Sequence, residues 1–187
     1  HIAFSVAATG SSLLGLNQAA SLGSLSVTGG TLQITSTNTS RTISLSGDLT
    51  VTGGSFALTG SSGTGTLNVT GGVSISGGMA TLSNGSGTGV LTVSGGVNLT
   101  GGTLNMNGST GASTLNVAGN FAQTSSNTLT RTSTGTGTIV FNGTTGQLFT
   151  AGGAITNGVN ITISNTSGVT LGSDISGLNG TLRMNSL

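Results

Sequence analysis

A register of 24 residues runs through most of this chain and constrains its fold more than any other feature. One column of apolar residues recurs at this spacing: Ile43, Leu67, Leu91, Leu115 and Ile139. A companion column follows two positions later: Leu45, Val69, Val93, Val117 and Phe141. Self-similarity at a fixed period of this length is typical of solenoids and other repeat arrays. A biased composition alone would not hold the phase over so many steps.

Two further pairs of apolar columns keep the same period. They are Leu49, Val73, Val97 and Phe121 with Val51, Ile75 and Leu99, and then Leu32, Phe56, Ala80 and Leu104 with Ile34, Leu58, Leu82 and Met106. Alternate side chains of a strand face the same side, so both members of each pair point inward. Glycine columns separate the pairs, among them Gly47, Gly71 and Gly95, and Gly63, Gly87, Gly111 and Gly135. Each repeat is therefore predicted to be three short strands joined by corners where the chain turns and glycine permits a positive φ.

These patterns predict an all-β chain without notable helices, folded as a β-solenoid (β-helix) of about 24-residue coils. Stacked columns would lie ~4.8 Å apart, so seven or so coils would give a rod of roughly 30–35 Å. A β-sandwich is the rival architecture, but it does not need a constant period. We expect residues 1–18 to be an irregular capping or docking segment. Residues 19–160 are expected to be solenoid coils whose register shortens after 139, and 161–187 final shorter coils without a cap.

The composition excludes several classes of function. The chain has 187 residues, with three Arg, two acidic residues, one His and no Cys, and its formal net charge is +1. Nucleic-acid binding needs clustered Lys and Arg, so it is not expected. Disulfides and cysteine-bound metals are excluded. No run of about 18 apolar residues predicts a transmembrane helix. Because the sequence opens on His1, we expect it to be a piece of a longer precursor.

The few residues able to carry chemistry do not form a constellation. His1 has no partner nearby in sequence, and Asp48 and Asp174 lie in different repeats. Paired carboxylates of glycosidases stand about 5–10 Å apart, which the repeat gives no reason to expect. The column of Asp48 continues as Gly72, Gly96, Asn120 and Thr144, so calcium bound in every coil is not expected either. We predict no catalytic, cofactor-binding or metal-binding residues, and an enzyme is not expected.

Threonine and arginine positions suggest surface properties. Thr42, Thr66, Val90, Thr114 and Thr138 form one column, with Thr64 and Thr136 beside it. Regular threonine arrays on flat solenoid faces resemble those of ice-binding proteins. Threonine is also the ordinary outward residue of any strand, and Val90 and Ala112 interrupt the rows. The three arginines fall in different columns and are expected to be solvated: Arg41, Arg131 and Arg183.

Residues 19–182 resemble the long β-strand-repeat proteins of bacterial cell surfaces. The carrying stretches are "LTVSGGVNLTGGTLNMNG", "LNVAGNFAQTSSNTL" and "GTIVFNGTTGQLFT". That family includes passenger regions of autotransporters and adhesin-like proteins of Bacteroidota. The resemblance implies secretion, a β-solenoid fold and a role as stalk, adhesin or filament, and it assigns no catalytic residue.

Together these patterns predict a structural or adhesive protein at the bacterial cell surface. Unguarded strand edges, with no Lys or Pro anywhere, favour head-to-tail or lateral self-association. Surface glycans are a second expected partner. The alternative function is a binding module that binds carbohydrate or ice on a flat solenoid face rich in Thr, Ser and Asn.

Overall fold

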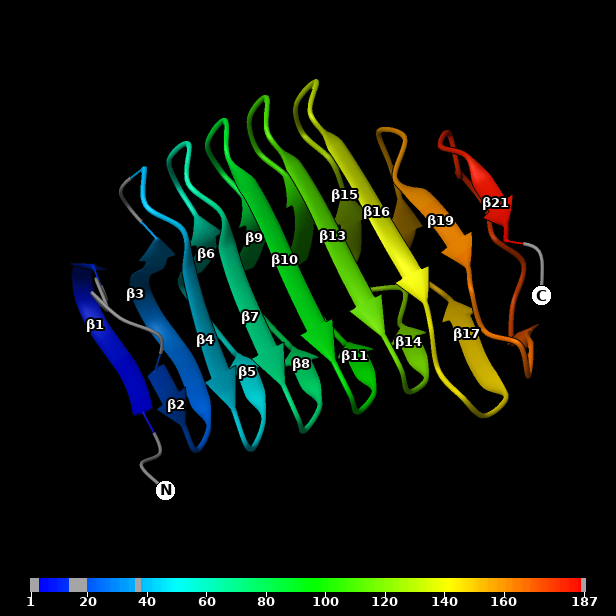
Figure 1. Ribbon diagram of the computed structural model, residues 1–187, viewed down its shortest axis with the longest axis horizontal. Coiled ribbons are helices and arrows are strands. Elements are labelled where there is room, and N and C mark those ends of the chain that lie inside the picture. Colours follow the sequence, from blue (N-terminus) through cyan, green and yellow to red (C-terminus); the bar gives the residue numbers. More distant parts are fainter. Residues whose placement is uncertain (1–3, 14–19, 36–37, 186–187) are drawn as a thin grey trace.

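All strand pairs in the described structure of the protein are parallel. The computed structural model describes residues 4–13, 20–35 and 38–185, and these contain strands and turns but no helix. The strands stack into a β-solenoid of about seven turns, with successive coils side by side along the long axis (Figure 1). The predicted all-β solenoid is therefore confirmed.

Three stacks of strands make up the faces of the solenoid. Face 1 is an eight-stranded sheet of β2 (Ala20–Leu22), β4 (Arg41–Leu45), β7 (Gly65–Val69), β10 (Thr88–Val93), β13 (Ala112–Val117), β16 (Thr136–Phe141), β19 (Asn160–Ile163) and β21 (Leu182–Met184). Face 2 contains β5 (Leu49–Val51), β8 (Val73–Ile75), β11 (Val97–Leu99), β14 (Phe121–Gln123), β17 (Gln147–Ala151) and β20 (Val169–Leu171). Face 3 contains β6 (Ser55–Thr59), β9 (Met79–Ser83), β12 (Thr103–Asn107), β15 (Thr128–Thr130) and β18 (Ala154–Ile155).

One long strand joins faces 2 and 3 at the N-terminal end. This strand, β3 (Leu25–Thr35), pairs with β5 through its first half and with β6 through its second half. A further strand, β1 (Phe4–Leu13), runs parallel to β3 on its other side, with register shifts after Val6 and Ala7. Faces 2 and 3 therefore belong to one hydrogen-bonded sheet, although they turn a corner in every coil.

The 24-residue register is the actual pairing register of the central coils. On face 1, Leu67 pairs with Leu91 and Leu91 pairs with Leu115. On face 2, Val73 pairs with Val97, and on face 3, Ala80 pairs with Leu104. The apolar columns that the sequence predicts point inward and form one continuous core. Each fully buried large aliphatic side chain stabilises such a core by roughly 1.5–3 kcal/mol.

The register changes toward the C-terminal end, and not in the same way on each face. On face 3 it lengthens from β15 onward, because Leu104 pairs with Leu129 and Leu129 with Ile155. On face 1 the spacing shortens as expected, because Ile139 pairs with Ile161 and Ile161 with Leu182. On face 2 it first lengthens, because Phe121 pairs with Phe149. The extra residues lie in the corner 142–146, which lengthens without disturbing either strand. The row of Asp48 therefore continues as Leu148, whose N–H donates to Asn120 Oδ1 (2.8 Å), and the assignment of Thr144 to that row was wrong.

Three phenylalanines fill the core where the register changes. The ring centroids of Phe121 and Phe149 are 5.4 Å apart in an edge-on arrangement, and those of Phe141 and Phe149 are 5.1 Å apart. All three rings are almost completely buried. They occupy inward positions that hold valine or leucine in earlier coils. Larger side chains thus fill the interior of the coil that carries the lengthened corner.

The glycine columns have two different physical causes. Gly54, Gly78 and Gly102, at the corner between faces 2 and 3, have φ values of 67°, 65° and 63°, a region that L side chains rarely adopt. At the corner between faces 3 and 1, the cause is close packing of successive turns. A Cβ on Gly87 would lie 2.1 Å from the carbonyl oxygen of Gly63. Here glycine is needed because the backbone of the neighbouring coil leaves no room for a side chain.

Candidate functional surfaces

The two carboxylates of the chain lie far apart on the solenoid. Asp48 precedes β5 and Asp174 follows β20, so five coil steps separate their positions along face 2, or ~24 Å. That separation exceeds the span used by paired carboxylates in glycoside hydrolysis. Within the described residues, no group of three or more His, Cys, Asp or Glu side chains could hold a metal ion. His1 lies outside the described residues.

Asp48 links successive coils at an exposed corner. Its Oδ1 accepts a hydrogen bond from the Gly72 N–H at 2.7 Å, and its own N–H donates to Ser24 Oγ at 3.2 Å. The carboxylate thus occupies one position in a ladder that joins three coils. These hydrogen bonds between coils give Asp48 a structural role.

A shallow groove of about 380 Å³ crosses several coils of face 2. Its lining includes Asp48, Gly72, Gly96 and Asn120, which follow one another in successive coils. Aromatic rings, on which sugars usually stack, are absent from its lining. Every phenylalanine whose burial the structure describes is in the core: Phe56, Phe121, Phe141 and Phe149.

The outward side of face 1 presents polar residues in straight rows across the coils. One row contains Thr42, Thr66, Val90, Thr114, Thr138 and Asn160, and the next contains Ser44, Asn68, Thr92, Asn116, Val140 and Thr162. The predicted threonine column therefore lies in one register row. Both rows are uncharged from β4 to β19, and the second then continues from Thr162 to Arg183 of β21. Neighbouring side chains can bond along a row, as Asn116 Nδ2 does to Thr92 Oγ1 (3.3 Å).

The corner between faces 3 and 1 contains a column of polar side chains that the sequence analysis missed. Each of four residues donates a side-chain hydrogen bond to the carbonyl oxygen four positions later: Thr59 to Gly63, Ser83 to Gly87, Asn107 to Gly111 and Arg131 to Gly135. Because the four residues are of four different types, a search for identical residues at a 24-residue spacing does not find this column. The usable signal is a donor placed four residues before each member of a glycine column.

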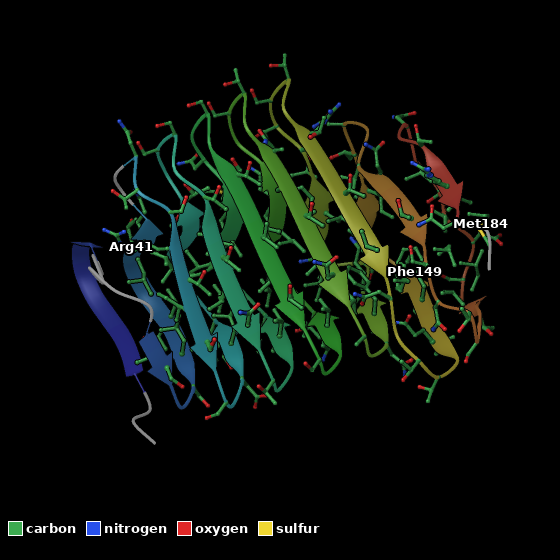
Figure 2. The ribbon with its side chains drawn as sticks, in the orientation of Figure 1. Arg41, Phe149 and Met184 are labelled. Atoms are coloured by element: carbon green, nitrogen blue, oxygen red, sulfur yellow. The ribbon has the colours of Figure 1, made fainter. Side chains whose placement is uncertain are left out.

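Arg131 departs from the expectation of a solvated surface arginine. Its side chain is partly buried, its Nη1 donates to the Gly135 carbonyl at 2.6 Å, and its Nε donates to the Asn157 carbonyl at 2.9 Å. These two bonds tie together corners of successive coils. The Arg41 side chain, by contrast, donates from Nη1 to the carbonyl of its neighbour Ser40 (3.1 Å), and Arg41 lies near the opposite end of the solenoid from Met184 (Figure 2).

The C-terminal end of the solenoid leaves the core open. Leu182 and Met184 of β21 pair with the inward Ile161 and Ile163, yet 52% and 63% of their surfaces are exposed. Leu171 of β20 pairs with the buried Phe149 and is 54% exposed. Together with their neighbours they line an apolar hollow of about 210 Å³. Met184 and Phe149 both lie toward this end in Figure 2.

Comparisons with known proteins do not place the chain in a family. The described residues contain no helix that is long and apolar enough to cross a membrane. No family model, no curated protein and no solved structure matches the sequence or the fold.

Proposed function

We propose that this chain is a structural, self-associating β-solenoid that serves as a rigid segment of an extracellular bacterial fibre or adhesin stalk. The observation that carries the proposal is the open core at the C-terminal end. Copies of the chain would stack end to end, with the open end of one copy covered by the first coil of the next. The proposed occupant of the apolar hollow is therefore a second copy of this chain.

The columns of the core support stacking at this end. Leu182 occupies the same column as Leu67, Leu91 and Ile161, all of which are buried because another coil covers them. Leu182 is exposed only because no coil of the described structure follows it. A further coil in the same register would bury it, together with Leu171 and Met184.

Backbone groups at the same end add a template for pairing. Among the described strands, β18, β20 and β21 each pair on one side only. Unpaired edges of this kind accept strands from another chain, and natural proteins usually block them with lysine, proline or a covering element. Stacking head to tail preserves the parallel direction of every strand. The contact is heterologous, so it continues into a filament instead of closing.

The expected strength of the contact is moderate. Covering three half-exposed side chains would stabilise the contact by about 1 kcal/mol each. Association itself costs an estimated 4–15 kcal/mol, so the backbone hydrogen bonds of a new coil step must contribute as well. Assembly is therefore expected to depend on protein concentration.

Sedimentation velocity across a wide concentration range tests this proposal. The wild type is expected to form species larger than a monomer as concentration rises. The substitution Met184→Lys, made together with Leu182→Lys, places charges at the open end and should keep the chain monomeric. The matched control is Met79→Lys, because Met79 is also exposed (41%) but lies on β9, at the side of the rod. A wild type that stays monomeric throughout, or a control that suppresses assembly equally, would contradict the proposal.

The extracellular location is supported by the resemblance of the repeats to bacterial surface proteins. It can be tested by antibody labelling of intact cells that produce the natural protein. Labelling without permeabilisation is expected, and labelling only after permeabilisation would contradict it.

A second candidate function is supported by the straight rows on face 1. From β4 to β19 these rows carry no charge, and a periodic array of hydroxyl and methyl groups suits an ordered surface such as ice or a carbohydrate. Thermal hysteresis and glycan-array binding by the isolated monomer would support this function. The substitution Thr114→Lys, at the centre of the array, should then abolish the activity, whereas Ser74→Lys on face 2 should leave it unchanged.

A further inference from the structure

The charge of Arg131 is not needed for the turn that this residue closes. Thr59, Ser83 and Asn107 close the equivalent turns of the preceding coils with neutral side chains. The length of the arginine is explained by its second bond, which reaches the Asn157 carbonyl in the next coil. The positive charge itself has no such explanation.

The guanidinium is held in one orientation with one nitrogen left over. Nη1 and Nε each donate to a backbone carbonyl, whereas Nη2 makes no hydrogen bond to any residue that the structure describes. Gly158 keeps the space beside this nitrogen open, because a Cβ there would lie 3.0 Å from Nη2. The backbone at Gly158 has a φ of 72°, which also favours glycine at this position.

A polar hollow of about 430 Å³ adjoins this guanidinium. Its lining consists of Arg131, Thr132, Ser133, Asn157, Gly158 and Asn179. The chain has only two acidic residues, Asp48 and Asp174, and neither lines the hollow. The hollow therefore contains a fixed positive charge without a counter-charge from the protein, beside hydroxyl and carboxamide groups.

We infer that this corner binds a sugar that carries a singly charged oxyanion, a carboxylate or a sulfate. The oxyanion accepts from Nη2 in a charge-assisted hydrogen bond, which is shorter and stronger than a neutral one. Ser133, Asn179 and the Oδ1 of Asn157, whose Nδ2 donates to Thr130 Oγ1 (3.1 Å), are the polar groups of the same hollow that would bond the hydroxyl groups of the sugar. One arginine balances one negative charge, so a singly charged group matches the site better than a phosphate chain. This inference does not depend on end-to-end assembly.

Nuclear magnetic resonance of the arginine side chains tests the site directly. The chain has three arginines, so a nitrogen-15 spectrum of the Nε–H groups of the intact protein contains three signals. The substitutions Arg131→Lys and Arg183→Lys assign them. Sodium glucuronate should shift the Arg131 signal in a saturable way and by more than the signals of Arg41 and Arg183. Methyl sulfate and a sulfated glucose separate sulfate from carboxylate, and acetate and glucose supply the anion and the sugar alone.

The inference requires selectivity for both the residue and the ligand. Glucuronate or the sulfated glucose should bind more tightly than acetate or methyl sulfate, and glucose alone should leave the Arg131 signal unchanged. An Arg131 signal that does not move selectively, or that responds equally to acetate and glucuronate, overturns the inference. The main readout uses the wild type, so it stands even if a substituted chain folds poorly. Where Arg131→Gln folds, it should weaken glucuronate binding about tenfold, the expected effect of losing a charge-assisted bond.

Discussion

The substitution Gly87→Ala tests whether successive coils are packed as closely as the structure shows. The new Cβ would lie 2.1 Å from the carbonyl oxygen of Gly63 and 2.7 Å from that of Ser61. Both obstructing atoms belong to backbone, so no side chain can move aside. The two turns would have to separate by about 1.3 Å to bring the new Cβ to an ordinary 3.4 Å contact.

The cost of this separation can be worked from the contacts that it breaks. The Gly87 N–H donates to the Ser61 carbonyl at 2.8 Å, and losing this bond costs about 1 kcal/mol. Crowding in a packed interior costs a further ~1–3 kcal/mol. The smaller entropy of alanine in the unfolded chain offsets about 0.4–1 kcal/mol of this. We expect the free energy of unfolding to fall by about 2–3 kcal/mol.

Urea unfolding followed by circular dichroism measures this effect, with Gly146→Ala as the matched control. The nearest atom to a Cβ on Gly146 is the Ser167 carbonyl oxygen at 3.8 Å, so this substitution should change stability by less than about 0.5 kcal/mol. If Gly87→Ala unfolds at the same urea concentration as Gly146→Ala, the close packing of the corner column is refuted.

Three other predictions follow from the core, the left-handed turns and the charges. Phe121→Ala should lower the free energy of unfolding by about 3–5 kcal/mol, because it removes a buried ring that contacts Phe141 and Phe149. Urea unfolding measures this loss, and a value below about 1 kcal/mol would contradict the packing. Gly168→Ala should lower the free energy of unfolding by about 1–2 kcal/mol, because φ at this position is 86°. No atom lies within 4 Å of the new Cβ, so an unchanged urea midpoint would show that the backbone there is not strained by alanine. With only five charged residues, the thermal midpoint should be almost independent of sodium chloride concentration in calorimetry, and a large shift would reveal an ionic contribution that the fold does not explain.

The sequence predicted the fold well because the core is built from columns. The recurrence of Leu67, Leu91 and Leu115 at a fixed spacing indicates one position that stacks in successive coils. Because alternate side chains of a strand point to opposite sides, each pair of apolar residues also identifies the side that faces the core. The number of strands in each coil follows from the three apolar pairs. Neither inference needs knowledge of how the corners are built.

The corners were harder to predict because their sequences are free to vary. The lengthened corner 142–146 keeps Phe149 in register with Phe121, and counting 24 positions from Asn120 therefore reached Thr144 instead of Leu148. Length changes in a loop cost little, whereas a slip within a strand would expose its apolar side chains. An apolar column is thus a safer guide to register than residue counting across a glycine-rich corner.

The hollow beside Arg131 could not be found from sequence alone. It depends on contacts between residues of different coils, Arg131 with Asn157, and on the left-handed backbone at Gly158. The exposure of Leu171, Leu182 and Met184 on the last described strands is likewise a property of the structure. Its consequence for assembly remains a prediction.

Electron cryomicroscopy of the wild-type chain at high concentration tests the central proposal most directly. End-to-end stacking predicts filaments one solenoid wide, with strands perpendicular to the filament axis and a repeat of ~4.8 Å along that axis. The spacing should continue without interruption from β21 of one copy into the first coil of the next. Dispersed single rods, or filaments whose strands run along the filament axis, would contradict the proposal.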